Sequence, residues 1–325
     1  MVSTTSSINP TKIEIFLTFL TLGLSSFGGP IAHLGFFNKE LVIKRRWLDS
    51  QLFSELVALC QFLPGPSSSQ VGLSIGFIKG GFSGALAAWI GFTTPSAIIL
   101  ILFGYGYAVY SDVIPFGAIH GLKIFAVAIV AQAIWTMGLT FCKDVKCIII
   151  TVAVGIFIVL APTPLFQFSA IILSGVIGAF VFNISETKEE SKFQYLIKIR
   201  LALTLLLSFF ILLFLLPILV NVLDNPVLSV IDSFYRAGSL VFGGGHVVLP
   251  LLQTEIVSAG YVSNEAFLAG YGAAQAMPGP LFTFAAYLGT VSGSYPNGLF
   301  GGLLALFAIY LPSFLLVIGV LPFWH

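Results

Sequence analysis

The run LALTLLLSFFILLFLLPILVNVL, from Leu201 to Leu223, limits what this chain can fold into more than any other feature. It carries no charged side chain, and it is long enough to cross a bilayer, which takes roughly 20 helical residues. The whole chain agrees, because 58% of its residues are hydrophobic and 8% are charged, against about 25% charged in a soluble domain. So few charges cannot cover a soluble surface. We therefore predict an all-α, multi-pass protein of the cell membrane, either a plasma membrane or a bacterial inner membrane.

Apolar segments predict where the chain crosses the bilayer. The expected spans lie near residues 13–28, 82–109, 118–141, 147–161, 165–182, 200–222, 229–245 and 297–320. Two further segments, 51–79 and 264–292, each consist of two short apolar pieces separated by Pro-Gly-Pro. Proline removes a backbone donor and clashes with the preceding turn, so we expect a broken helix in both segments. Whether these segments cross the membrane or re-enter it stays open.

Two parts of the chain repeat each other in order and at nearly constant spacing. The matched pieces are QFLPGP (61–66) with QAMPGP (275–280), FGGPIAHL (27–34) with FGGGHVVL (242–249), GGFSGALAA (80–88) with GLFGGLLAL (298–306), Glu40 with Glu255, and Pro95-Ser96 with Pro312-Ser313. We interpret them as a duplicated membrane unit, which is typical of transporters. The first repeat covers residues 1–182, a charged linker with a linking transmembrane helix covers 183–226, and a shortened second repeat covers 227–325.

With these motifs the chain resembles the chromate ion transporter family. The resemblance rests on FGGP and FGGGHVVLP, on Pro-Gly-Pro in each half, and on the run from Gly81 to Ser96, and it covers nearly the whole chain. It implies a secondary transporter that exports chromate, confers chromate resistance and has two oppositely oriented halves. The second half is shorter than the family pattern, because nothing after 297–320 matches 118–182. A non-transporting partial membrane subunit is therefore an alternative.

Chromate is a tetrahedral dianion, and it needs hydrogen-bond donors. A buried cation is costly in lipid, whereas a helix N-terminus offers free N–H groups and about half a positive charge. Each Pro-Gly-Pro ends one helix and begins another, and the serines of PSSSQ add hydroxyl donors. The glycine runs allow close backbone approach. The expected substrate-binding residues are Gly28, Gly29, Gln61, Pro64, Gly65, Pro66, Ser67, Ser68, Ser69, Gln70, Gly243, Gly244, Gly245, Gln275, Pro278, Gly279, Pro280 and Thr283.

Ionisable residues inside apolar segments are candidates for coupling or charge roles. They are Glu55, Lys79, His33, Arg236 and His246. Asp232 precedes Arg236 by one helical turn, so the two can form an i,i+4 pair that is purely structural. Lys79 can reach the membrane surface with its charged end, and each histidine can either carry a proton or hydrogen-bond locally.

Other functions are less well supported by the sequence. Sulfate or another oxyanion is an alternative substrate, because sulfate is also a tetrahedral dianion. A membrane enzyme is a rival, but no metal cluster, nucleophile–base motif or Walker A sequence is visible, and we expect no cofactor. The net charge of +1 gives no reason to expect nucleic-acid binding. The expected partners are the oxyanion and the lipid bilayer, and a homodimer stays open.

Overall fold

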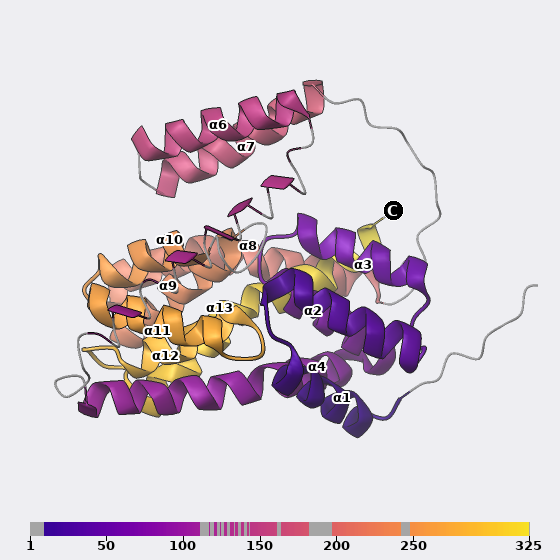
Figure 1. Ribbon diagram of the computed structural model, residues 1–325, viewed down its shortest axis with the longest axis horizontal. Coiled ribbons are helices and arrows are strands. Elements are labelled where there is room, and N and C mark those ends of the chain that lie inside the picture. The colour runs from indigo at the N-terminus through magenta and orange to yellow at the C-terminus, as the bar shows by residue number, and fades with distance from the viewer. Residues whose placement is uncertain are drawn as a thin grey trace, which may run out of the picture. The chain divides into compact units, whose positions relative to one another are not determined.

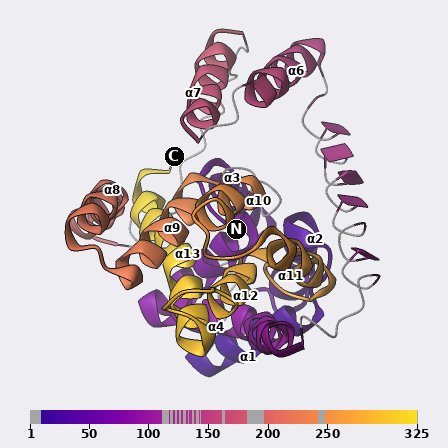
Figure 2. The same ribbon diagram turned by 90° about the vertical axis from the view of Figure 1, so that its left-hand side faces the viewer.

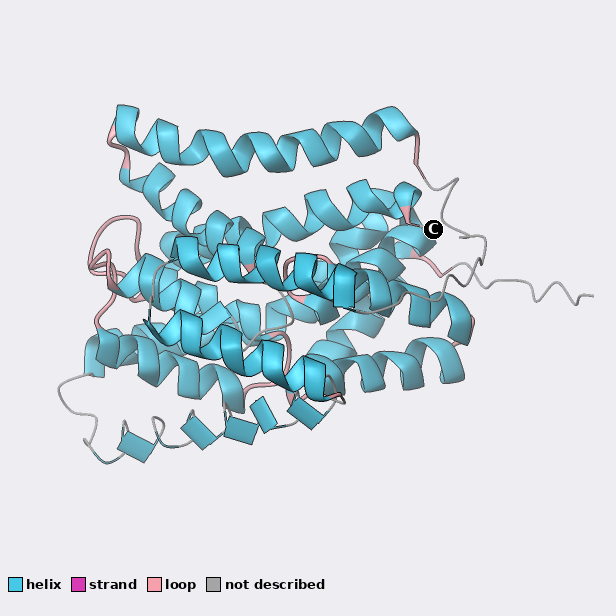
Figure 3. Ribbon diagram, turned by 90° about the horizontal axis from the view of Figure 1, so that it is seen from above, coloured by secondary structure: helices cyan, strands magenta, loops and turns pink. Residues whose placement is uncertain are grey.

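The computed structural model describes residues 10–110, part of 117–144, and residues 145–160, 164–181, 197–241 and 248–324. All regular structure in these ranges is helical (Figure 3). Three of the described helical segments are long and apolar enough to cross a membrane: Ser67–Tyr110, Ile199–Leu223 and Gly298–Phe323. By contacts the chain forms one unit of residues 1–126 and 191–325 and a second unit of residues 127–190.

The first unit begins with a series of short helices that leads into a long one (Figure 1). These are α1 (Lys12–Ser25), α2 (Gly29–Phe37), the π-helix η1 (Asn38–Lys44), α3 (Ser50–Phe62) and α4 (Ser67–Tyr110). A capping box between Thr11 and Glu14 starts α1, and the Asp49 side chain caps α3 by accepting from the Leu52 N–H. Such caps satisfy donors that a helix start leaves free, and they fix where each helix begins.

The second half of this unit runs through a comparable order of elements. They are α8 (Ile199–Leu223), α9 (Pro226–Leu240), α10 (Val248–Leu252), the π-helix η2 (Gln253–Val257), α11 (Asn264–Ala276), the 3₁₀ turn η3 (Leu281–Thr283), α12 (Phe284–Thr290), α13 (Gly298–Val320) and the 3₁₀ turn η4 (Leu321–Phe323). Helices α12 and α13 pack against α4 (Figure 2). The second unit contains two described helices that pack together, α6 (Val145–Leu160) and α7 (Pro164–Val181).

Two predicted spans run past the helices that the structure contains. The span expected at 13–28 stops at Ser25, because Ser26 is extended and Gly28, with a φ of 96°, starts the next helix α2. The span expected at 229–245 stops at Leu240, and Val241 is extended. The span expected at 118–141 lies largely outside the described residues.

Helix α4 is two helices that fold back on each other at Gly81, where φ is 63° and ψ is −154°. The backbones of Gly76 and Gly84 touch, since a Cβ atom on Gly84 would meet the Gly76 carbonyl oxygen. Eight residues along a straight helix are about 12 Å apart, so this contact requires a reversal of direction. Gly289 of α12 and Gly301 of α13 make the same kind of backbone contact.

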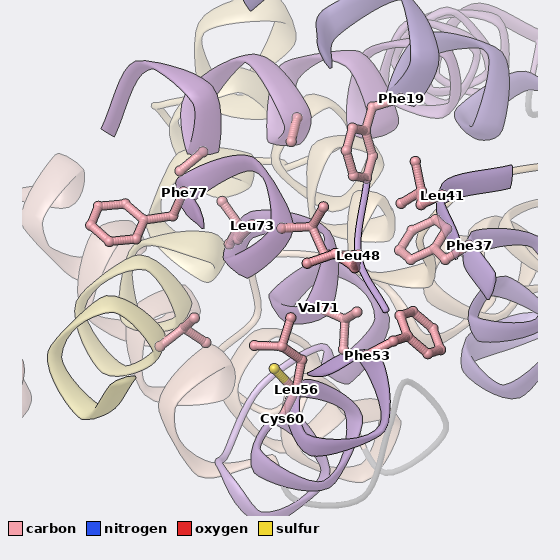
Figure 4. Packing of buried hydrophobic residues seen from close by; sticks show 14 of the residues in the cluster. Phe19, Phe37, Leu41, Leu48, Phe53, Leu56, Cys60, Val71, Leu73 and Phe77 are labelled. Carbon is pink, nitrogen blue, oxygen red and sulfur yellow. The ribbon is translucent and has the colours of Figure 1, made fainter. Parts of the chain in front are cut away.

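The chain also folds back at Pro64-Gly65-Pro66, between α3 and α4. The Sγ atom of Cys60 lies 3.8 Å from the Oγ atom of Ser74, and Figure 4 shows Leu56 and Cys60 close to Val71 in the apolar core. Cys60 and Ser74 lie on opposite sides of the break. They could not meet if α3 and the start of α4 pointed away from each other. We refer to α3 with residues 67–80 as the first hairpin and to Pro64–Pro66 as its tip.

A second hairpin has the same construction around Pro278-Gly279-Pro280. The rings of Phe267 and Phe284, on α11 and α12, lie 5.2 Å apart. The Tyr287 hydroxyl donates to the Ala266 carbonyl oxygen at 2.9 Å. These contacts fold α12 back against α11, and Pro278–Pro280 form the tip of this second hairpin.

Candidate functional site

The tip of the first hairpin is held by a bond to the other half of the chain. The Gly65 N–H donates to the carbonyl oxygen of Val241, the residue that ends α9, at 2.7 Å. Gly65 has a φ of 124°, which favours glycine. The Gln70 Nε2 group donates to the Pro64 carbonyl oxygen at 2.6 Å and closes the tip from inside.

The tip of the second hairpin makes the reciprocal bond. The Gly279 N–H donates to the carbonyl oxygen of Ser26, the residue that ends α1, at 2.8 Å. Gly279 has a φ of 100°. Ser26 and Val241 occupy matching places, each directly before its FGG motif. Each tip is therefore fixed to the end of a helix in the opposite half.

A serine from the opposite half also lies against the glycine of each tip. The Oγ atom of Ser313, on α13, lies 2.8 Å from where a Cβ atom on Gly65 would stand. The Oγ atom of Ser96, on α4, lies 2.8 Å from the same position on Gly279. Any side chain at either glycine would displace a serine from the opposite half, so both tips need glycine for space as well as for conformation.

Three hydroxyl groups gather where α4 and α13 meet. The hydroxyl of Tyr310 lies close to those of Ser69 and Thr93, and all three residues are buried. Within the described part of the chain none of the three hydroxyls has a recorded hydrogen-bond partner. The Trp89 ring lies 5.6 Å from the Tyr310 ring. We refer to Ser69, Thr93 and Tyr310 as the hydroxyl cluster.

Buried polar atoms without partners concentrate around the hydroxyl cluster and the two tips. Among the described residues, Glu55 Oε2, Asp232 Oδ1 and Arg236 Nε are also without partners, and the atoms around the cluster and the tips are Ser26 Oγ, His33 Nε2, Ser69 Oγ, Gln70 Oε1, Trp89 Nε1, Thr93 Oγ1, Tyr310 OH and Ser313 Oγ. A buried group left unsatisfied costs about 1–3 kcal/mol, and each such group in a native fold calls for an explanation. All of the groups around the cluster and the tips except Gln70 Oε1 can donate a hydrogen bond, so together they suit a ligand that accepts many.

The three serines that follow the first tip have different surroundings. The Ser68 Oγ atom lies 3.2 Å from His33 Nδ1, so this hydroxyl is already engaged. The His33 ring packs edge-on against Phe92 with centroids 5.5 Å apart, and its second ring nitrogen lies near the Ser26 backbone. The Ser69 hydroxyl instead lies near that of Tyr310, within the hydroxyl cluster. Ser67 is buried in the first turn of α4, where backbone N–H groups lack partners within the helix.

The remaining predicted residues divide between the tips and places away from them. Gln61 is exposed. The Gln275 Nε2 group donates to the Tyr271 hydroxyl, and the Thr283 hydroxyl donates to the Pro280 carbonyl oxygen at 2.7 Å, so both have local partners. Lys79 is partly exposed at the far end of the first hairpin. Glu55 lies on α3, and its Oε2 atom is buried without a partner among the described residues.

Four of the predicted residues lie outside the described part of the chain, namely Gly243, Gly244, Gly245 and His246. Their matched residues in the first half, Gly28 and Gly29, sit directly after Ser26, which binds the second tip. The described residues contain no group of three His, Cys, Asp or Glu side chains that could hold a metal ion.

Arg236 forms an ion pair with Asp232 at 3.0 Å, which confirms the expected i,i+4 contact. It also binds Glu255, at 2.8 Å. Sequence reasoning missed Glu255 as a third member of this charged group, although it stood out as the match of Glu40.

The same reasoning flagged Pro95-Ser96 and Pro312-Ser313 only as repeats and did not consider Thr93 or Tyr310. Tyr310 and Thr93 hold matched places two residues before these Pro-Ser pairs, and that symmetry was the available signal.

Comparisons with known proteins agree on one family. The model of the family described as chromate transporter matches residues 13–180 and 228–325. A chromate transport protein of Pseudomonas aeruginosa is 25% identical over 96% of this chain and 74% of its own length. A probable chromate transport protein of Synechococcus elongatus is 27% identical over 94% of this chain and 75% of its own length.

An uncharacterized transporter of Methanocaldococcus jannaschii is 24% identical over 97% of this chain and 77% of its own length. The comparison with solved structures gives no match.

Proposed function

Because the chain belongs to the chromate transporter family, we propose that it carries chromate across the cell membrane as a secondary transporter. The observation that carries this proposal is the set of unpartnered donors between the two hairpin tips. Hydroxyl, indole and backbone N–H groups bind an oxyanion without the cost of a buried cation. A tetrahedral dianion has four oxygen atoms, and it can accept bonds from several sides of such a site at once.

In this proposal the hydroxyl cluster and the two tips make one binding site. Ser69, Thr93 and Tyr310 supply hydroxyl donors, and the free N–H groups in the first turn of α4 supply the positive end of a helix dipole. Ser96 and Ser313 lie against the tips from opposite halves. Because each tip is bound to the other half, a relative movement of the halves changes both tips together. This coupling gives a physical route to alternating access.

We further propose that the two halves are inverted repeats built from re-entrant hairpins. Besides the two hairpins above, α1 and α2 fold back, with the Phe19 and Phe37 rings 5.6 Å apart, and α9 folds back on η2 through the Arg236–Glu255 bond. If both helix pairs of each repeat are re-entrant, the first helix to cross the membrane is the part of α4 after Gly81 in the first repeat. In the second repeat it is α13. The family model also matches two separate stretches, which supports a duplication.

The distribution of basic residues supports this topology. If the pairs are re-entrant and the spans predicted from the sequence at 82–109, 118–141, 147–161, 165–182 and 200–222 each cross once, the basic groups at 39–46, 143–146 and 188–200 fall on one side of the membrane, and the second repeat enters from the opposite side. The positive-inside rule places that basic side in the cytoplasm. Inverted halves and the positive-inside rule then agree, which they cannot do if the Pro-Gly-Pro segments cross.

We propose that transport runs outward. Moving one charge through the membrane potential is worth about 2.3 kcal/mol per 100 mV, so a dianion leaving a negative cell gains about twice that amount. Outward transport of chromate would give resistance to it. Sulfate fits the same donors, because it is also a tetrahedral dianion, and it is the second candidate substrate.

The test is chromate uptake by proteoliposomes that contain the purified chain, with a membrane potential imposed in either direction. We expect saturable uptake that reverses its preferred direction with the potential, and competition by sulfate measures the selectivity. Liposomes with Tyr287→Phe protein serve as a matched control, since that hydroxyl lies at the base of the second hairpin. Absence of chromate flux from well-folded protein would contradict the proposal and favour a partial subunit.

A further inference from the structure

Arg236, Asp232 and Glu255 form a charge cluster that belongs to one half of the chain only. Arg236 lies 3.0 Å from Asp232 and 2.8 Å from Glu255. The places that match Asp232 and Arg236 in the first half hold Leu17 and Thr21, which form no ion pair. With one cation and two carboxyl groups, the cluster carries a net charge of −1 when both carboxyls are ionised.

The environment of Asp232 makes that negative charge unfavourable. The Asp232 side chain is 6% exposed and the Glu255 side chain 15% exposed. One Asp232 oxygen binds Arg236, and the other, Oδ1, is buried without a hydrogen-bond partner within the described part of the chain. A carboxylate needs its lone pairs satisfied when it leaves water. A proton on Asp232 removes the excess charge without losing the contact with Arg236.

Among the described residues of the neighbouring elements, no second cation forms an ion pair with the cluster. Helices α8 and α13 pack against α9, and α10 and α11 pack against η2. Their described residues include two more charged side chains, Arg200 in the first turn of α8 and Glu265 in the first turn of α11, and neither forms an ion pair with the cluster that the structure records. On α9 itself, the Tyr235 hydroxyl donates to the Phe209 carbonyl oxygen. The other tyrosines are Tyr271 on α11, which bonds Gln275, and Tyr310 on α13, in the hydroxyl cluster.

We propose that Asp232 is a proton-binding site, held beside Glu255 and Arg236, and that its protonation is coupled to the movement of chromate. The coupling rests on the proposed function, whereas the site itself does not. Arg236 is 34% exposed, so the cluster is open on that side. When Asp232 is ionised, both carboxylates compete for one guanidinium, and when it is protonated, the bond between Arg236 and Glu255 is unopposed.

The position of the cluster links protonation of Asp232 to the first hairpin tip. Asp232 and Arg236 lie on α9, and α9 ends at Val241, whose carbonyl oxygen holds the tip of the first hairpin through Gly65. Glu255 lies on η2, a π-helix, and such segments are frequent at functional sites. A change in the bonding between α9 and η2 therefore acts on the helix that anchors the tip.

The first half contains a natural control. Glu40, the match of Glu255, binds two cations, Lys44 at 3.0 Å and Arg45 at 2.7 Å. Partial burial favours its neutral form, but the hydrogen bonds from Arg45 and Lys44 outweigh burial and hold the pKa of Glu40 below its ordinary value. Glu40 should therefore stay ionised, although it lies on a π-helix that matches the one carrying Glu255.

Infrared spectroscopy of the purified full chain tests the site without any transport. We expect a protonated carboxyl band at neutral pH that disappears in Asp232→Asn. It should also disappear in Glu255→Gln, because a single remaining carboxylate is neutralised by Arg236 and needs no proton. In Glu40→Gln the band should stay. A band that survives both changes, or wild-type protein without a protonated carboxyl at neutral pH, would overturn the site.

Flux measurements then test the coupling. In proteoliposomes, a pH gradient should change the wild-type rate of chromate transport at least severalfold, and this dependence should be lost in Asp232→Asn and Glu255→Gln while transport continues. A pH dependence that persists in both variants would overturn the coupling and leave the infrared result standing. If no variant or wild-type protein moves chromate, the proposed function fails, and the infrared result still decides the proton site.

Discussion

Replacing Tyr310 with phenylalanine separates a ligand site from a structural contact, because the two roles predict opposite effects on stability. The Tyr310 hydroxyl is buried beside Ser69 and Thr93 and has no hydrogen-bond partner among the described residues. Phenylalanine fills the same volume and removes only the hydroxyl. The ligand-free protein should therefore gain about 1–3 kcal/mol of unfolding free energy, which is the cost of an unsatisfied buried group.

Chromate binding should change in the other direction. A hydrogen bond to a charged group is worth about 1.5–3 kcal/mol, and each 1.4 kcal/mol is a factor of ten in affinity. The apparent affinity of Tyr310→Phe for chromate should fall by roughly ten- to a hundredfold. Ser69→Ala should fall by a similar factor, whereas Ser68→Ala should change affinity less, because the Ser68 hydroxyl is engaged by His33.

The assay is the concentration dependence of chromate uptake in proteoliposomes, together with thermal unfolding of the same protein in detergent. Tyr287→Phe is the control, since its hydroxyl already donates to Ala266 at 2.9 Å. That change should lower stability by about 0.5–1.5 kcal/mol and leave the affinity alone. Lower stability with unchanged affinity in Tyr310→Phe would refute the reasoning, because the hydroxyl would then be a structural donor.

Three more perturbations test the parts that hold the site. Gly65→Ala and Gly279→Ala should each cost about 1–3 kcal/mol of stability from backbone strain alone, measured by thermal unfolding. Gly35→Ala is the control, because a Cβ atom there meets nothing within 4 Å. Equal stability of all three variants would contradict the tip geometry. Gly84→Leu should abolish folded expression, because the side chain would enter the Gly76 backbone, while Gly106→Leu, in open space, should express. Arg236→Ala should destabilise by about 3–5 kcal/mol, since it strands the buried Asp232 and the partly buried Glu255, and Arg236→Ala with Asp232→Asn should recover part of that loss in chemical denaturation.

Local sequence was enough to predict a helical membrane protein and to single out the elements around the tips. Apolar runs long enough to span a membrane coincide with α8 and α13. Pro-Gly-Pro drew attention to Gly65 and Gly279, because proline and glycine act on their own backbone. The ends of α1 and α9 were placed too late, because the FGG motifs are apolar and continue the hydrophobic pattern, although the chain is already extended at Ser26 and Val241.

What could not be predicted depends on contacts between residues far apart in the chain. Ser67, Ser68 and Ser69 look alike in sequence. In the fold, however, the Ser68 hydroxyl contacts His33 and the Ser69 hydroxyl lies near Tyr310. The bond from Gly65 to Val241 and the bond from Gly279 to Ser26 join opposite halves. The hydropathy of a segment does not say whether its two pieces fold back. That arrangement needed side-chain contacts such as Cys60 with Ser74.

The most direct test of an oxyanion site between the tips uses Trp89 as a reporter. Its Nε1 atom is buried without a partner, and its ring lies 5.6 Å from the Tyr310 ring. Chromate absorbs where tryptophan emits, whereas sulfate does not. In protein with Trp47, Trp135 and Trp324 changed to phenylalanine, chromate should quench Trp89 emission saturably, sulfate should restore it, and Tyr310→Phe should weaken the quenching at least tenfold. Quenching that never saturates, or that is as strong with Tyr310→Phe, would place the anion elsewhere.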